Sequence, residues 1–147
     1  MAAAKAKTEQ DENLFKGSLP PSVYTVEGEA VVGTFVRLAK GIPHDEYGIS
    51  PVVVFTYESG KFADRAGTIE DGVVGKEYGW YLISEVARNE FKRVLPKTGE
   101  RIAFRDDGKA PSGSRLDAKG NPVEYHVIRF SCPDRPIETT EFDVNDL

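Results

Sequence analysis

The chain has 147 residues, a formal net charge of −5 and one cysteine, Cys132. Its length fits one compact domain with tails, and the single cysteine excludes an intrachain disulfide framework and a cysteine cluster for structural zinc. The sequence lacks an apolar run of the roughly 20 residues that a membrane span needs, and its opening segment lacks the apolar block of a signal peptide. We therefore expect a cytoplasmic protein that makes no membrane contact.

Charge is distributed unevenly along the sequence. Residues 138–147 contain four acidic residues and no basic ones, so they carry −4 and the rest of the chain carries −1. Between Arg88 and Lys119, nine lysines and arginines stand against five acidic residues. The pattern indicates a nearly neutral body with a basic sector and an acidic tail.

The hydrophobic pattern predicts a mainly β domain with one helix. Ser84 is a suitable N-cap for that helix, and Pro96 ends it. The first residues show no periodicity, which predicts a flexible N-terminal arm at 1–19, a domain at 20–137 and an acidic tail at 138–147. The five strands are expected at 24–38, 49–59, 77–83, 100–108 and 123–132, and the helix at 85–95.

Alternation within the strands predicts which side chains face the core. The first strand is unusually long, and Gly28 and Gly33 are positions where it can bulge or coil to serve two parts of a closed barrel. In that strand Val32, Val36 and Leu38 are placed on one face, and Phe35 and Arg37 on the other, more polar face. In the third strand Tyr81 is expected to pack inward, while Tyr78 and Trp80 look outward.

The order of the elements, with the helix between the third and fourth strands, resembles the OB-fold, a five-stranded Greek-key barrel. In detail, FKRVLPKTGERIAFRDDGK followed by YHVIRF is similar to small phage-encoded OB proteins that bind single-stranded DNA. The resemblance covers about residues 24–132. It implies a closed OB-like barrel, binding of single-stranded DNA with little sequence preference, and a role in phage replication or recombination within the host cytoplasm.

Binding single-stranded DNA requires aromatic rings on which bases stack and cations along the phosphate path. The predicted outward rings and the basic sector supply both. The structural alternative is that the aromatics are half buried without a ligand and that the basic loop is only solvated. The candidate nucleic-acid-binding residues are Phe35, Arg37, Tyr47, Tyr78, Trp80, Arg101, Arg105, Lys109, Arg115 and Lys119.

The acidic end resembles the tail tip of bacterial single-stranded DNA-binding proteins, which docks into partner enzymes. The segment EFDVNDL sets Phe142 and Leu147 among acidic residues that include Asp143 and Asp146, although it ends in Leu rather than Pro-Phe. The resemblance implies replication or recombination proteins as partners of these four residues. Most acidic C-termini serve only solubility, which is the alternative.

Little in the sequence points to catalysis. The adjacent His44, Asp45 and Glu46 lack the spacing of a metal site, and His126 is expected to be a core or rim histidine. No nucleophile elbow, P-loop or dinucleotide fingerprint appears. We therefore expect no enzyme activity, cofactor or metal. The competing hypothesis is a protein-interaction or inhibitor module, a phage accessory protein, that uses the barrel and the tail; a homo-oligomer is compatible with either.

Overall fold

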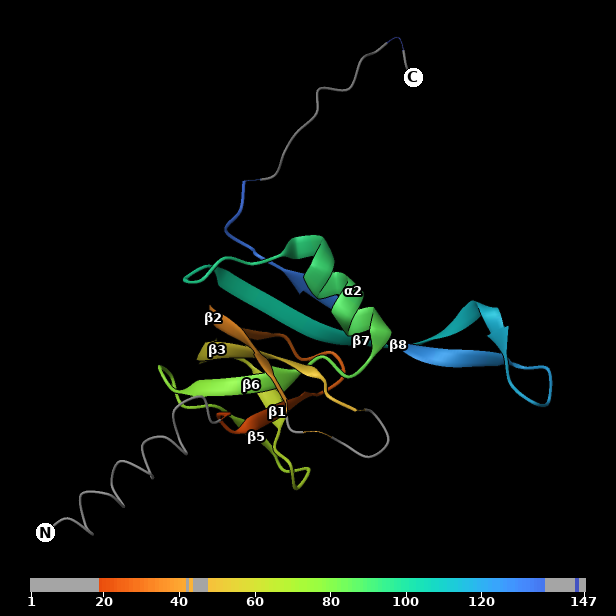
Figure 1. The fold of residues 1–147 in the computed structure, drawn as a ribbon, viewed down its shortest axis with the longest axis horizontal. Coiled ribbons are helices and arrows are strands. Elements are labelled where there is room, and N and C mark those ends of the chain that lie inside the picture. Colours follow the sequence, from red (N-terminus) through yellow and green to blue (C-terminus); the bar gives the residue numbers. More distant parts are fainter. Residues whose placement is uncertain (1–18, 42, 44–47, 137–144, 146–147) are drawn as a thin grey trace, which may run out of the picture.

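The fold is described for residues 19–41, 43, 48–136 and 145 of a computed structural model (Figure 1). The predicted N-terminal arm up to residue 18, Tyr47, and the tail residues Phe142, Asp143, Asp146 and Leu147 lie outside this part of the chain. Within it the elements are β1 Ser22–Thr25, β2 Val31–Lys40, β3 Pro51–Ser59, β4 Lys61–Ala63, β5 Ile69–Asp71, β6 Glu77–Tyr81, α2 Glu85–Val94, β7 Arg101–Leu116 and β8 Pro122–Ser131.

The strands form one mixed sheet with the order β5-β4-β1-β6-β3-β2-β7-β8. The pair β1–β6 is parallel, and the other pairs are antiparallel. The prediction of a mainly β protein is confirmed. The prediction of a closed five-stranded barrel is wrong, because the sheet is open and no ladder joins β8 to β6 or β1 among the described strands.

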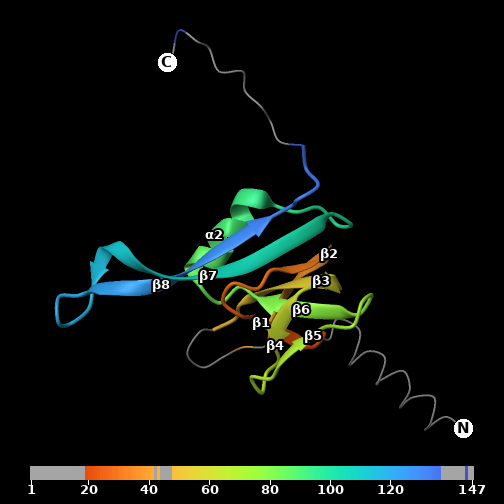
Figure 2. The same ribbon diagram turned by 180° about the vertical axis from the view of Figure 1, so that it is seen from behind.

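The helix agrees closely with its prediction. Ser84 is the N-cap and its Oγ accepts a hydrogen bond from the Ala87 backbone N–H at 3.1 Å. Leu95 follows in the left-handed conformation, with φ 47°, and its N–H donates to the Phe91 carbonyl. Pro96 prevents continuation. The helix therefore lies between β6 and β7, and Figures 1 and 2 show it against β7 and β8.

The long first strand of the prediction is two strands separated by a turn. Gly28 adopts φ +82° in that turn, a conformation that glycine takes readily, and its N–H donates to the Asp106 carbonyl. At Gly33 the predicted bulge is present, with a register shift beside it. A Cβ there would lie 2.4 Å from the Thr56 carbonyl oxygen, so glycine is needed for the close approach of β3.

Aromatic rings fill the core. The ring of Trp80 on β6 stacks on Phe104 of β7, with centroids 4.1 Å apart and planes 2° apart, and it also lies 5.9 Å from Phe130 of β8. In the sheet order, β3 and β2 separate β6 from β7. The sheet must therefore curl, so that strands distant in its order share one aromatic core.

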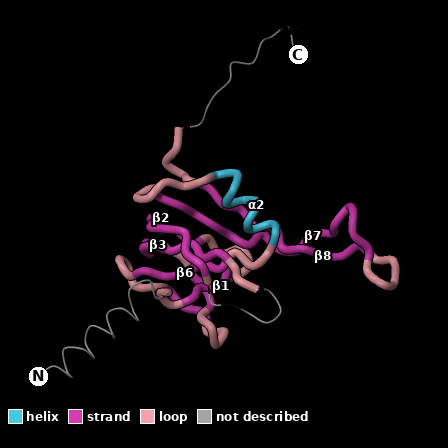
Figure 3. Tube along the Cα trace, in the orientation of Figure 1, coloured by secondary structure: helices cyan, strands magenta, loops and turns pink. Residues whose placement is uncertain are grey.

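Beyond the core, β7 and β8 continue as a two-stranded arm that projects from the body (Figures 1 and 3). Their register runs from Ala103–Ser131 at the body to Leu116–Pro122 at the tip, with irregularities after Asp106 and after Pro111. The side chains on the outer part of the arm are largely exposed. The sequence placed a connection between the strands expected at 100–108 and 123–132; that prediction is wrong for most of the segment, because β7 continues to Leu116.

We expect Trp80→Ala to lower the free energy of unfolding by about 3–5 kcal/mol, the usual cost of deleting a large buried aromatic. Trp80 is only 4 % exposed. The measurement is urea denaturation followed by far-UV circular dichroism. Tyr125→Ala, which truncates an exposed aromatic on the arm, is the control and should change stability by less than about 0.5 kcal/mol. Equal effects of the two substitutions would contradict this account of the core.

Candidate functional site

The open side of the curled sheet contains a groove of about 420 Å³. It lies where a barrel would have closed, between the β1 and β6 strands on one side and β7, β8 and the start of α2 on the other. The groove thus follows directly from the missing ladder. Its lining residues are Val23, Tyr24, Thr25, Trp80, Tyr81, Ile83, Ser84, Ala87, Asp106, His126 and Ile128.

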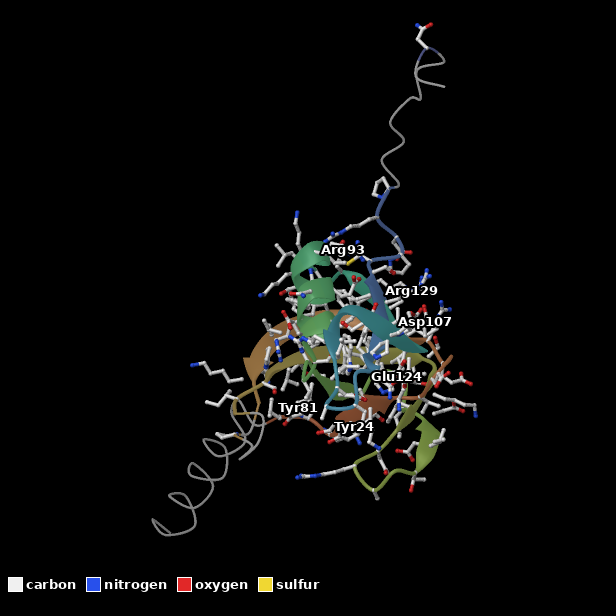
Figure 4. All side chains as sticks on the ribbon, turned by 90° about the vertical axis from the view of Figure 1, so that its right-hand side faces the viewer. Tyr24, Tyr81, Arg93, Asp107, Glu124 and Arg129 are labelled. Carbon is white, nitrogen blue, oxygen red and sulfur yellow. The ribbon has the colours of Figure 1, made fainter. Side chains whose placement is uncertain are left out.

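Two tyrosines provide the aromatic surface of the groove. Tyr24 on β1 is 38 % exposed, and Tyr81 at the end of β6 is half-buried. Figure 4 shows both below the arm, on the side of the molecule toward which the arm points. Tyr81 also lines a second hollow of about 470 Å³ that contains the exposed Arg65. Tyr81 thus belongs to the lining of both hollows.

A histidine–carboxylate pair forms the polar part of the groove. Asp106 on β7 is buried, and its Oδ1 accepts a hydrogen bond from the Gly108 backbone N–H at 2.8 Å. Its Oδ2 lies 2.8 Å from Nδ1 of His126 on β8. The side chain of His126 remains 50 % exposed. The imidazole thus lies against a buried carboxylate in the lining of the groove.

The irregularity in β7 turns a lysine toward the same side. Asp106 pairs with Ile128 and Lys109 pairs with His126, so two residues of β7 oppose one of β8. Side chains of directly opposed residues share a face in an antiparallel pair. Lys109 therefore projects on the face of His126, and it is exposed. Tyr125, next to His126 in the strand, projects on the other face of the arm.

The predicted stacking rings are not on the surface. Phe35, Tyr78 and Trp80 are 6 %, 5 % and 4 % exposed, so their predicted outward orientation is wrong. The hydroxyl oxygen of Tyr78 accepts a hydrogen bond from the Val73 backbone N–H at 2.9 Å. In both strands the true inward face is one residue out of phase with the prediction, which exchanges every side chain between core and surface.

The predicted cations Arg101 and Arg105 do project away from the core, but they lie on the outer face of β7 and not in the groove. The guanidinium of Arg101 is within 2.8 Å of Glu58 and 3.4 Å of Asp134. Arg105 pairs with Asp107, and this pairing lowers the pKa of the Asp107 carboxyl. Each arginine thus already has a carboxylate partner. Such exposed pairs are individually weak.

The remaining predicted cations are spread over the molecule. Arg115 on the arm lies 3.7 Å from Glu85 at the start of α2, and Lys119 is exposed at the tip of the arm. Arg37 is half-buried on β2 and does not line the groove. Of the nine predicted binding residues that the structure describes, Trp80 alone lines the groove, and Lys109 projects on its side.

A separate ionic cluster fixes the chain after β8. The guanidinium of Arg135 donates to the carbonyls of Val94 and Leu95, which end the helix, and to both carboxylate oxygens of Glu100. These hydrogen bonds, together with the Lys97 backbone N–H, lower the pKa of Glu100 to about 2 from 4.5. The cluster thus caps α2 and holds the segment that follows β8 against it.

Comparison with known proteins identifies no relative: no family model, no curated protein and no solved structure matches the chain. Within the described residues, three or more metal-ligating side chains are nowhere grouped so as to hold an ion. In the same part of the chain, no helix has the length and apolar character to cross a bilayer.

The low pKa of Glu100 predicts a pH-dependent contribution to stability. Because the folded-state pKa is below the unfolded-state value, the unfolded chain binds more protons between about pH 4.5 and 2, and stability falls as the pH falls through that window. We expect Glu100→Gln to be less stable than the wild type at pH 5 and above, with the gap closing toward pH 2. Urea midpoints across this range measure it. Glu124→Gln, at an exposed carboxylate of the arm, is the control and should run parallel to the wild type.

Proposed function

We propose that the protein binds single-stranded DNA along the groove on the open side of its sheet, with the arm alongside the bound strand. The observation that carries the proposal is the groove itself, at whose edge Tyr24 and Tyr81 are accessible to solvent while their strand neighbours Val23 and Trp80 face the aromatic core. Single-strand binders combine such rings with cations beside them. The proposal keeps the ligand class that the OB resemblance implies and moves the binding surface from the predicted rings to these two tyrosines.

Basic side chains lie on two sides of the groove. Lys109 projects on the groove side of the arm, and Arg65 lines the hollow that continues past Tyr81. The arm between Lys109 and His126 carries three basic and two acidic residues, so it repels a phosphate chain less than the average charge of the protein suggests. We propose low sequence specificity in the main contacts, because every base has a flat face that can stack and every nucleotide carries a phosphate. The phage replication or recombination setting comes from the sequence resemblance.

A second candidate function is a protein-interaction module, which the arm favours. Leu116, Val123 and Tyr125 are exposed there, with Leu116 at 68 %. Apolar side chains on a projecting element are typical of a docking surface for another protein. This candidate needs no nucleic acid, so a direct binding experiment separates the two.

We expect Tyr24→Ala and Tyr81→Ala each to weaken binding to a fluorescently labelled single strand of mixed sequence by about 1–3 kcal/mol, the usual value of one stacked base. Fluorescence anisotropy at low salt measures the dissociation constants. Tyr125→Ala is the control: it removes a tyrosine from the face of the arm opposite to His126, and this variant should bind DNA like the wild type. If the wild type binds no strand at low salt, the DNA proposal fails and the protein-interaction candidate is favoured.

The salt dependence of binding should identify the face that meets the phosphates. We expect Lys109→Ala to reduce the slope of log K against log salt by about 0.7, the value for one phosphate contact on a single strand. Arg105→Ala, on the outer face and already paired with Asp107, should leave the slope unchanged. The opposite result would place the DNA on the outer face of β7 and would contradict the groove as the binding surface.

A further inference from the structure

The projecting arm has a free backbone edge. In the described part of the chain, β8 is the last strand of the sheet and pairs with β7 alone. The ladder between β7 and β2 covers only Arg101 to Phe104, so the outer part of the arm is a ribbon of two strands. Figures 1 and 2 show this ribbon clear of the described body. Two strands alone are marginally stable in water, and a further strand stabilises such a ribbon.

Two hydrogen bonds at the base of the arm show which backbone groups of β8 point to the free edge. The carbonyl of Phe130 accepts from the Arg93 guanidinium of α2 at 3.0 Å, so it is directed away from β7. On β7, the carbonyl of Asp106, which lies opposite Ile128, accepts from the Gly28 N–H at 2.8 Å and is directed away from β8. Direction alternates along an antiparallel strand. The backbone groups of the even-numbered residues of β8 therefore point to the free edge.

This edge has few of the features that usually prevent strand pairing. The N–H and C=O of Glu124 and His126 lie on it, and Pro122, which has no N–H, ends the usable part. The five residues after Pro122 are β-branched, aromatic or able to form polar pairs, and they include no proline, glycine or lysine. Val123 and Tyr125 are 37 % and 41 % exposed. The edge is thus suited to accept another extended strand.

The segment Val-Glu-Tyr-His-Val at 123–127 is complementary to itself in antiparallel pairing. With a two-fold axis at Tyr125, Val123 lies opposite Val127 of a second copy, and Glu124 lies opposite His126 of that copy. The valines and tyrosines then form apolar pairs on one face of the ribbon, and the carboxylates and imidazoles form polar pairs on the other. Each Glu124–His126 pair exchanges two backbone hydrogen bonds, which gives four in all.

We infer that the partner of this edge is a second copy of the chain, and that two arms join through β8 into one four-stranded sheet centred on Tyr125. The interface is isologous, because the same segment of each copy contacts its equivalent. A two-fold axis perpendicular to the ribbon keeps the faces of both arms aligned, so both grooves open on the same side of the dimer. The inference goes beyond the proposed function and does not rest on DNA binding.

The first experiment measures the mass of the full chain by sedimentation equilibrium. A short ladder belongs to the weak class of interfaces, so the measurement covers about 1 µM to about 500 µM. We expect the average mass to rise from 16.2 kDa toward twice that value. At the lowest concentrations the copies are separate, so Tyr125→Ala stays a valid control for DNA binding.

A proline substitution tests the backbone edge. Glu124→Pro removes an N–H that points to the free edge and leaves the hydrogen bonds between β7 and β8 in place. Because the symmetry loses this donor twice, the dissociation constant of the dimer should rise about tenfold or more. Glu124→Gln is the matched control, since it keeps the N–H and a polar side chain, and its constant should stay within about threefold of the wild type. Circular dichroism checks that both variants fold.

Cysteine cross-linking tests the register. At a non-hydrogen-bonded pair the Cα atoms are about 4.5 Å apart, which a disulfide can span, so Tyr125→Cys should give a covalent dimer on mild oxidation with diamide. Val123→Cys should not, because two copies of position 123 are offset by four residues, or about 14 Å. A mixture of Val123→Cys and Val127→Cys should cross-link again. The buried Cys132 is present in every variant and so serves as the common background.

A wild type that stays at 16.2 kDa throughout the concentration range would overturn the inference. A dimer that is unaffected by Glu124→Pro, or one that cross-links equally through positions 123 and 125, would overturn it as well, because the copies would then meet through another surface. If Glu124→Pro does not fold, the mass of the wild type and the cross-linking pattern still decide the question.

Discussion

The parallel stack of Trp80 on Phe104 is the contact on which the rest of the structure depends. It joins a strand near the middle of the sheet to one near its end, and so it holds the sheet in a curl. Phe130 and Phe91 continue the same layer, with ring centroids 5.7 Å apart. Large rings span this width with few side chains, because each buries far more apolar surface than an aliphatic residue. The curl brings β8 opposite β6 but forms no ladder between them, and the groove is the space that results.

The groove is therefore a product of fold rather than of a local motif. In a fully closed barrel the edges of the first and last strands would be hydrogen-bonded to each other, and Tyr24, Tyr81 and His126 would be on separate surfaces or in the wall. Here β1 pairs with β6 in parallel and occupies the edge that a closing strand would need. One short N-terminal strand thus determines that the sheet stays open.

Local sequence signals predicted the elements well. The helix from Ser84 to Pro96 combines an N-cap, helical spacing and a proline stop, and it forms where expected. The second, third and fifth predicted strands also formed near their bounds, whereas the fourth, expected at 100–108, continues to Leu116. The phase of the first and third strands was wrong, since both faces carry apolar residues there: in Tyr78-Gly-Trp80-Tyr81 nothing in a two-residue period says which ring faces inward. That choice is made by Phe104 and Phe130, which lie far along the sequence.

The same limit applies to the site. The cations of β7 were correctly placed on its outer face, yet the carboxylates that pair with Arg101 come from β3 and from the segment after β8, and a strand pattern contains no such information. Lys109 reaches the groove only because of an irregular step in β7, and Asp106-Asp107-Gly108 looks like a simple turn in the sequence. Tyr24 and His126 become neighbours only through the curl. A site built from a gap between distant strands leaves no compact signature in one sequence.

The Arg135 cluster determines where the segment after β8 lies relative to the groove. Arg135 fastens the chain at the carboxyl end of α2, whereas the groove begins at the amino end, at Ser84 and Ala87. A helix of 10 residues separates these points by about 15 Å. The segment that ends at Pro136 is thus anchored at the end of α2 away from the groove, so a ligand in the groove and the contacts of Arg135 do not compete for the same surface.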